Sequence, residues 1–402
     1  MNGVLQGLDP TRELVPLGLR ERLVTLRRDL HQHPELSFAE HRTRDVLAGE
    51  LDRLAPTRLD RVARTGLIAR IAGRDARLPV VAVRGDIDAL PIQEATGLPF
   101  ASTSTGIMHA CGHDVHATWT VGAAALLSVE PADGDVLVVL QPAEEIGEGA
   151  AAVLESGLLA DVKAIFGAHV DRRFTVGQVV AQAGPLAAST DVFEITLAGR
   201  GAHSARPHES ADPVVCMAAL ITALQTIVSR RVNPATAAVV TVGMVSAGTA
   251  PNVIPDRATL RGTLRAIDHE TRALLQDELR WIATHVAASH RVEATVTFGA
   301  GVPPVVNDAR ATAWASDAAL GVLGAGAIVP LGITNMAGED FAWYQQRIPG
   351  CFLRIGARAP DQPVIPAHSP MFDVAEDAIF VGAALLAECA RRASAALAAA
   401  AR

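Results

Sequence analysis

Short apolar segments of strand length alternate with helical patterns along the first half of the chain. Residues 78–83 form a continuous apolar run, which is typical of a strand in a sheet that is covered on both faces. Residues 67–72, 135–140 and 162–168 are also expected to be strands, and leucines at helical spacing predict a helix over residues 17–31. This order predicts an α/β domain, in which functional side chains gather where the strands end.

Length and charge limit the class of protein. The chain has 402 residues, half of them hydrophobic, which predicts two or three domains with a large core. The net charge of −8 argues against a general nucleic-acid binder. No apolar run is long enough to predict a membrane span, and residues 1–15 lack the pattern of a signal peptide. The four cysteines lie far apart, unlike a disulfide framework, so we expect a cytoplasmic protein that binds neither membrane nor nucleic acid.

Residues 108–116 concentrate three histidines, one cysteine and one aspartate in nine positions. Cys111 and His113 are separated only by Gly112, and residues 117–129 are expected to form a helix directly after the cluster. The positive end of a helix dipole favours a thiolate, and thiolate and neutral imidazole are the forms that bind metal. These residues could also be packing residues, and no second ligand pair completes a structural zinc site. Metal binding is favoured because ligand-type residues follow other predicted strands.

Acidic residues and histidines recur just after the predicted strands. There are alternatives to a functional role: the carboxylates after the strands could simply cap turns, and an acidic pair could lie in a solvated loop. Asp88 is expected to orient a metal-bound histidine, whereas His31 and His33 are interpreted as favourable charges at a helix end. Neighbouring side chains in an extended segment point opposite ways, so one glutamate of a pair can bind metal while the other acts as a base. The residues after predicted strands or the loops beyond them are Asp86, Asp88, Glu144, Glu145, His169 and His368.

The pattern changes at about residue 187. Predicted elements over residues 187–300 follow the order β-α-β-β-α-β, which indicates a ferredoxin-like domain inserted into the larger one. We therefore expect a catalytic domain made of residues 1–186 and 301–402, with an inserted domain of residues 187–300. The insert carries His203 and Asn252 on loops framed by glycine and proline. Two interpretations stay open: these loops only connect elements, or they contact the substrate.

Five candidate ligands are too many for one tetrahedral catalytic ion with an open position. They fit two divalent ions that share a bridging group and a water molecule. Glu144 is then left to take a proton from that water. The five candidates are Cys111, His113, Glu145, His169 and His368.

Five segments together resemble the aminoacylase/carboxypeptidase metallopeptidase family. They are residues 30–37 with His33-Pro34-Glu35, residues 84–91 with Asp86-Ile87-Asp88, His109-Ala110-Cys111-Gly112-His113-Asp114, Gln141-Pro142-Ala143-Glu144-Glu145, and His368-Ser369-Pro370. They are most similar to the amidohydrolase branch, which includes hippurate hydrolases, N-acyl-amino-acid amidohydrolases and plant indole-acetyl-amino-acid hydrolases. The resemblance spans nearly the whole chain.

The resemblance implies a two-metal, aminopeptidase-like catalytic domain with an inserted lid that also forms a homodimer. It implies that Cys111, His113, Glu145, His169 and His368 bind the metals and that Glu144 is the general base. It further implies that His203 steadies the oxyanion in the partner subunit's site, and that Asn252 and Arg265 contact the substrate. Val115 and Arg172 depart from the residues usual at their positions in the family. Either difference could change the shape of the acyl pocket, so the resemblance does not determine the acyl group of the substrate.

These observations predict an enzyme that hydrolyses the amide bond of N-acyl amino acids or related small amides. Carboxylate and imidazole ligands suit manganese, cobalt, nickel or zinc, and a thiolate favours zinc or cobalt. One alternative is a dipeptidase or carboxypeptidase of the same family. Another is a catalytically silent homologue that only binds metal or ligand.

Overall fold

The computed structural model describes residues 13–334 and 336–401, and the chain divides into two compact units. The first unit contains Met1–Gly184, Asn307–Gly332 and Trp343–Arg402, and the second contains Pro185–Val306 and Ile333–Ala342. The predicted domain boundaries at residues 187 and 300 stay predictions, because compactness does not show that a unit folds independently. The return of residues 333–342 to the second unit has no counterpart in the sequence pattern.

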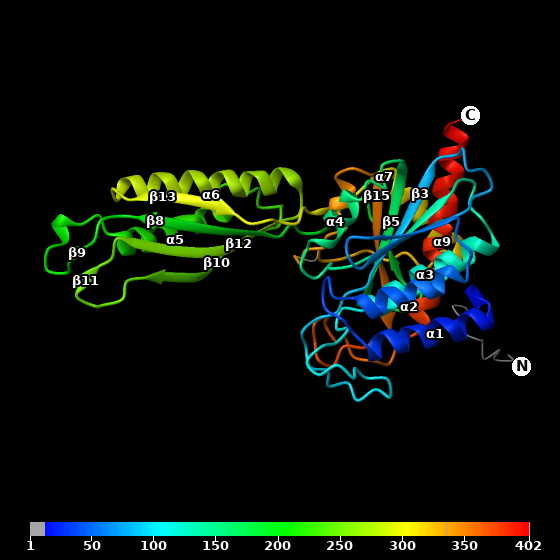
Figure 1. Cartoon of the computed structure of the whole chain (residues 1–402). Helices are drawn as coiled ribbons and strands as arrows, with labels where there is room; N and C mark the ends of the chain where they lie inside the picture. Colours follow the sequence, from blue (N-terminus) through cyan, green and yellow to red (C-terminus); the bar gives the residue numbers. More distant parts are fainter. Residues whose placement is uncertain (1–12, 335, 402) are drawn as a thin grey trace, which may run out of the picture. The chain divides into compact units, whose positions relative to one another are not determined.

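The first unit is built on a seven-stranded sheet with the order β1-β2-β4-β3-β5-β15-β6 (Figure 1). The four central strands β4, β3, β5 and β15 are mutually parallel, whereas β1, β2 and β6 pair antiparallel with their neighbours. Every residue of β3 and β4 is buried, as predicted for a sheet covered on both faces. The strands are β1 (Arg58–Val62), β2 (Gly66–Ile71), β3 (Val80–Asp86), β4 (Val136–Gln141), β5 (Val162–Thr175), β6 (Val179–Val180) and β15 (Gly350–Arg358).

Helix α3 (His113–Val129) is almost wholly buried and packs against β3, α1 and α9. The ring of Trp119 lies against Gly382 of α9, where a Cβ atom would come within 2.2 Å of the ring. Arg391 of α9 donates to the carbonyl of Leu126 at 3.0 Å, in the last turn of α3. Helix α9 therefore fixes the position of α3. The other helices of this part of the chain are α1 (Leu17–Gln32), α2 (His41–Asp52), α4 (Gly149–Glu155), α7 (Ala309–Leu323), α8 (Ala342–Gln345) and α9 (Asp377–Ala400).

Several predicted boundaries were wrong. Strand β3 spans Val80–Asp86 rather than residues 78–83, so Asp86 is its last residue. Helix α3 begins at His113 rather than at residue 117, because Gly112 takes a φ of 92° as its N-cap and the histidines lie in the first turn. Strand β5 continues to Thr175 rather than ending at residue 168, because its parallel pairing with β15 extends that far. The polar residues of this extension hid it from the apolar pattern.

The second unit has the predicted ferredoxin-like order of elements. Its antiparallel sheet runs β10-β12-β8-β13, and helices α5 and α6 cover one face with a core that includes Phe193, Leu220 and Leu279. Asp212 and Asp268 accept backbone N–H groups at the starts of α5 and α6, as N-cap residues do. The elements are β8 (Asp191–Ala198), α5 (Pro213–Arg230), β10 (Ala238–Ala247), β12 (Arg257–Ala266), α6 (His269–Ser289) and β13 (Glu293–Phe298).

Two short pairs of strands complete the described secondary structure. Strand β9 (Ala202–His203) pairs with β11 (Val253–Ile254), and β7 (Gly184–Ala187) pairs with β14 (Val305–Asn307). Within the described residues, α5 is the one helix long and apolar enough to cross a membrane. Cys216, Leu220 and Leu224 on α5 are fully buried in the core of this unit, whereas Val215 on the same helix is exposed.

Candidate metal centre

The structure brings together all five predicted ligands within the first unit. The Sγ atom of Cys111 lies 3.3 Å from Nε2 of His169, and Nε2 of His368 lies 3.5 Å from Oε2 of Glu145. Nε2 of His113 lies 3.9 Å from Oε1 of Glu145. Residues from α3, from β5 and from three loops therefore converge at one end of the sheet, as expected where parallel strands end.

The donor atoms form two overlapping groups. Those of Cys111, His113 and His169 lie within 4.8 Å of one another, and so do those of Cys111, Glu145 and His368. Cys111 belongs to both groups, so its sulfur lies where two ions could share one ligand. A pair of divalent ions fits this arrangement better than a single ion, because one tetrahedral ion cannot use five ligands.

Two buried atoms of the cluster have the chemistry and the spacing to bind a cation. Nε2 of His113 and Oε1 of Glu145 are both buried and have no hydrogen-bond partner, although each faces the other across 3.9 Å. Buried polar atoms are nearly always paired, and leaving one unpaired is costly. A divalent ion between them would satisfy both atoms.

Burial sets the protonation of the ligands. Burial raises the pKa of Glu145 to about 7, against the opposing effect of His113. Burial and the Glu145 carboxylate both raise the pKa of the Cys111 thiol. Burial lowers the pKa of His169 and of His368, which keeps both imidazoles neutral. A bound cation would favour the thiolate and the carboxylate, since metal binding displaces protons from such ligands.

Asp88 holds two of the ligands in place. Its Oδ1 atom lies 3.1 Å from Nδ1 of His113, and its Oδ2 atom accepts the backbone N–H of Glu145 at 3.0 Å and the hydroxyl of Ser37 at 2.8 Å. A carboxylate only accepts hydrogen bonds, so Nδ1 of His113 carries the proton and Nε2 keeps its lone pair for a metal. This geometry is the one expected for an orienting role of Asp88.

The third histidine of the 108–116 cluster has no lone pair left for a metal. Nδ1 of His116 donates to Asp86 at 2.6 Å, and its Nε2 accepts the backbone N–H of Val170 at 2.9 Å. His116 thus holds β5 beside the candidate ligand His169, whose own Nδ1 donates to the carbonyl of Val170 at 2.6 Å.

Glu144 and Glu145 lie on a turn rather than on an extended segment. Ala143 has a φ of 54°, and residues 144–147 form a turn. As a result Oε2 of Glu144 and Oε1 of Glu145 both lie 3.9 Å from Nε2 of His113. The expectation that the two side chains point opposite ways was therefore wrong. Glu144 nevertheless lies beside the proposed metal position, as a base must.

The predicted residues of the second unit do not all meet. His203 and Asn252 lie together, because His203 pairs with Val253 and the N–H of Ser204 donates to the carbonyl of Asn252 at 3.1 Å. Arg265 lies at the other end of β12, where it donates to the hydroxyl of Thr190 at 2.6 Å. Eight residues of strand separate Arg257 from Arg265, which is about 26 Å.

Sequence reasoning missed the buried arginine that contacts Asp114, the residue next to the candidate ligand His113. Arg27 is only 1% exposed, and its Nε donates to Asp114 at 2.8 Å. His31 makes a second buried contact with Asp114, at 2.8 Å. The available signal was position: Arg27 follows Leu23 by four residues and precedes Leu30 by three, on the buried face of α1. A charge on that face predicts a buried ion pair.

Val115 and Arg172, which depart from the family pattern, have structural contacts: Val115 packs in the core and Arg172 binds a loop. Val115 is fully buried in the core of the first unit. Arg172 is 5% exposed, and its guanidinium donates to the carbonyls of Asp373 and, at 2.9 Å, Pro363. These carbonyls flank the loop that carries His368, so Arg172 fastens that loop on both sides.

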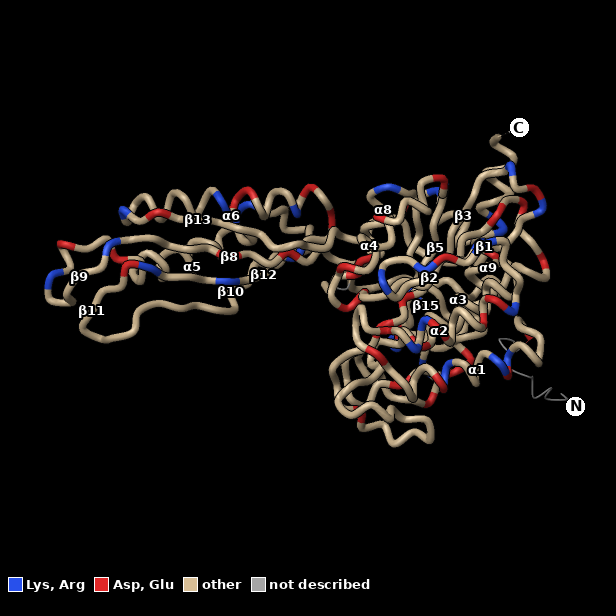
Figure 2. Tube along the Cα trace, viewed as in Figure 1, with Lys and Arg blue, Asp and Glu red and all other residues tan. Residues whose placement is uncertain are grey.

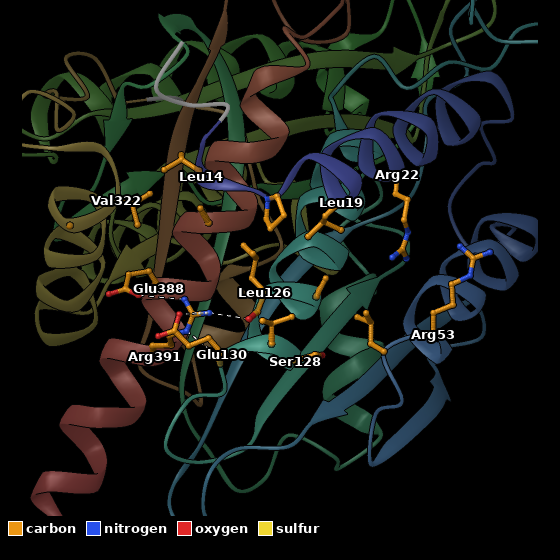
Figure 3. A pocket seen from close by; sticks show the side chains of 16 residues that line it. Leu14, Leu19, Arg22, Arg53, Leu126, Ser128, Glu130, Val322, Glu388 and Arg391 are labelled. Carbon is orange, nitrogen blue, oxygen red and sulfur yellow. Dashed lines mark hydrogen bonds and ion pairs between the residues drawn. The ribbon is translucent and has the colours of Figure 1, made fainter. Parts of the chain in front are cut away.

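The cavity drawn in Figure 3 has a volume of about 710 Å³ and lies at the C-terminal end of α3. Ala125 lines it, twelve residues or about 18 Å along the helix from His113. Arg391 at its wall is already bonded to Leu126 and lies near Glu130 and Glu388. This cavity offers none of the chemistry of the metal centre.

Comparison with known proteins agrees with this geometry. The profile of peptidase family M20/M25/M40 matches residues 82–392. The chain belongs to this family. It is 42% identical over 372 residues to an N-acetylcysteine deacetylase of Bacillus subtilis (strain 168), covering 92% of this chain and 96% of that protein. It is 39% identical over 377 residues to the IAA-amino acid hydrolase ILR1-like 5 of Arabidopsis thaliana, covering 92% and 86%.

Solved structures share the fold of this family member. The Bacillus subtilis YXEP protein, described as a dinuclear metal binding peptidase from the M20 family, superposes with a TM-score of 0.82 at 39% identity, covering 94% of this chain and 98% of that chain. The predicted family, fold class and enzyme class are thus confirmed, and two divalent metals agree with the ligand groups described above.

Proposed function

We propose that this enzyme hydrolyses the amide bond of N-acyl amino acids at a centre of two divalent ions. The observation that carries the proposal is the convergence of Cys111, His113, Glu145, His169 and His368 around two unpaired buried atoms, with Glu144 alongside. The names of the relatives support the substrate class, because one is a deacetylase of an acetylated amino acid and another a hydrolase of amino acid conjugates.

The chain's own residues account for the proton movements. When bound, the ions supply Lewis acidity toward the amide carbonyl and acidify a water molecule. Glu144 takes a proton from the attacking water and passes it to the leaving amine nitrogen as the C–N bond breaks. One water and one amide thus yield one carboxylate and one amine. His203 donates a hydrogen bond to the oxygen that becomes negative.

We assign zinc or cobalt as the preferred ions, with manganese and nickel as the other candidates. A thiolate shared by both ligand groups favours the softer metals, while the carboxylate and imidazoles accept all four. The four cysteines Cys111, Cys216, Cys351 and Cys389 are all buried and free. Free thiols accord with a reducing compartment, so we place the enzyme in the cytoplasm.

We further propose a homodimer that forms through the second unit. Strand β10 lies at the edge of its sheet and exposes 62% of Met244 and 56% of Val245. No charged residue occurs from Val239 to Pro255 (Figure 2), although edge strands of monomeric proteins are commonly protected by charges. Pairing with a second copy would cover this edge. His203 and Asn252, which lie far from Arg265 in one copy, could then serve the partner's site.

A mixing experiment tests the dimer and the role of His203 together. Copies carrying Glu144→Gln are mixed with copies carrying His203→Ala after subunit exchange. If His203 serves the partner's site, each mixed dimer has one intact site, and statistical exchange restores about a quarter of the wild-type activity. Activity that stays at the level of the separate variants contradicts the proposal.

A substrate panel tests the reaction. The metal-free enzyme is reconstituted with zinc, cobalt or manganese and assayed against N-acetylcysteine, hippurate, an indole-acetyl amino acid and unblocked dipeptides. Metal-dependent release of the free amino acid from the acyl compounds supports the proposal. Exclusive cleavage of dipeptides would favour a dipeptidase or carboxypeptidase. Metal binding without turnover of any member would favour a silent homologue.

A further inference from the structure

The turn that carries Glu144 and Glu145 adopts a backbone conformation that its sequence does not favour. Ala143 has a φ of 54°, in the left-handed region that residues with a Cβ atom avoid. This conformation decides where the next two side chains point. Something outside the turn must therefore hold Ala143 in place.

Three contacts fix the turn on different sides. The backbone N–H of Ala143 donates to Oε1 of Glu40 at 3.0 Å, and its carbonyl accepts the N–H of Gly149 at 3.1 Å. Pro142 lies so close to Gly66 that a Cβ atom on Gly66 would come within 2.8 Å of the proline ring. Of these contacts, only the one from Glu40 comes from a side chain that can be changed without altering the backbone.

Both carboxylate oxygens of Glu40 accept hydrogen bonds in the interior. Its side chain is fully buried, and its second oxygen accepts the hydroxyl of Thr65 at 2.5 Å. Burial of a carboxylate is costly unless hydrogen bonds compensate for it. Glu40 contributes a carboxylate from a segment 103 residues away from the turn.

The side chain of Glu40 does not cap the helix that begins next to it. Glu40 is the N-cap residue of α2, yet its side chain makes no cap hydrogen bond to that helix. Glu35 caps the helix instead, accepting the N–H of Arg42 at 3.1 Å and that of Thr43 at 2.8 Å. Glu35 therefore caps α2, while Glu40, although it is nearer the start of the helix, binds the backbone of the turn at Ala143.

We propose that Glu40 is a positioning residue, which holds Ala143 in its left-handed conformation and thereby places Glu144 for proton transfer and Glu145 for metal binding. The assignment rests on the proposed function for the roles of these two glutamates. Its structural part, the anchoring of Ala143, is independent of any activity.

Two variants at position 40 distinguish the hydrogen bond to Ala143 from the effect of filling the buried space. Glu40→Gln keeps an oxygen that can accept the N–H of Ala143, whereas Glu40→Leu fills the space without an acceptor. Glu35→Ala is the matched control, because it weakens the cap of α2 and leaves the turn untouched. Hydrogen exchange is measured on the metal-free proteins in the peptide that begins at Gln141, where Pro142 has no amide and Ala143 contributes the next one.

The leucine variant is expected to lose the slow exchange at Ala143, while the glutamine variant and the Glu35→Ala control keep it. In the zinc-loaded enzymes, Glu40→Leu should lower kcat by about 10- to 100-fold with little change in KM, as is typical for outer-shell partners of a metal site. Glu40→Gln should restore most of this loss. Adding Ala143→Gly to Glu40→Leu should recover about fivefold or more, because glycine adopts positive φ without strain.

The outcomes are distinct. Unchanged exchange at Ala143 in folded Glu40→Leu protein overturns the proposal, and so does a wild-type kcat per folded molecule. A lower melting temperature with unchanged exchange and kcat would show a purely structural role and also overturns it. If the wild-type enzyme cleaves no amide, the proposed function fails, while the exchange result still decides whether Glu40 anchors the turn.

Discussion

Replacing Asp88 with asparagine tests the central claim that one carboxylate orients two metal ligands. Oδ1 of Asp88 faces Nδ1 of His113, and Oδ2 accepts the N–H of Glu145. The amide of asparagine has only one acceptor oxygen. If that oxygen faces His113, the amide NH2 group faces the backbone N–H of Glu145, and two donors then oppose each other. The hydroxyl of Ser37 can instead rotate and accept a hydrogen bond from the NH2 group.

The expected loss follows from the contact that is broken. A hydrogen bond to a charged group contributes about 1.5–3 kcal/mol. The metal-free Asp88→Asn protein can relax away from the conflict, but metal binding requires the original arrangement, so the loss appears as weaker binding. At 1.36 kcal/mol for each tenfold change, metal affinity should fall by about 10- to 150-fold.

Competition with a chromophoric chelator measures the affinity of both ions. Ser37→Ala is the control, since it removes one acceptor contact of Asp88 and leaves those to His113 and Glu145 intact. This control should bind metal within about threefold of the wild type, because the Ser37 hydroxyl contacts neither candidate ligand and Asp88 keeps its contacts to His113 and Glu145. Wild-type affinity in a folded Asp88→Asn protein would refute the reasoning.

Three further results are expected. Glu144→Gln should lower kcat by about 10²–10⁴-fold yet retain both ions, as measured by metal analysis, and normal turnover would exclude it as the base. Because burial raises the pKa of Glu145 to about 7 and also raises that of Cys111, metal binding should release protons and strengthen as pH rises through 7. Calorimetry in buffers of different ionisation enthalpy measures this release, and an affinity independent of pH would contradict it. Arg172→Met should loosen the loop that carries His368 and weaken metal binding by about 10-fold, whereas unchanged affinity would show that the loop needs no such support.

The sequence predicted which candidate residues lie together where ligand-type side chains follow parallel strands. The apolar runs of β3 and β4 are fully buried, so the positions of the residues that follow them could be inferred from the convergence of parallel strands. Cys111, His113, Glu145, His169 and His368 were recognisable because each offers a metal-binding atom near such a strand end or the loop beyond it.

The supporting contacts could not be inferred in the same way. Glu40 meets Ala143 across 103 residues, and Arg172 meets Asp373 across 201. Such pairings depend on tertiary packing, and a single sequence carries no local signal for them. The left-handed turn at Ala143 was missed for the same reason, since the contacts that impose it come from Glu40, Gly66 and Gly149.

The packing of Trp119 against Gly382 has a consequence for biosynthesis. Helix α9 is translated after every other described element, yet it supplies the surface on which α3 rests. On the ribosome, the nascent polypeptide therefore holds Cys111 and His113 in an unfinished environment until the residues around position 382 have emerged. We therefore expect Cys111 and His113 to reach their final positions only after α9 has been translated and has packed against α3.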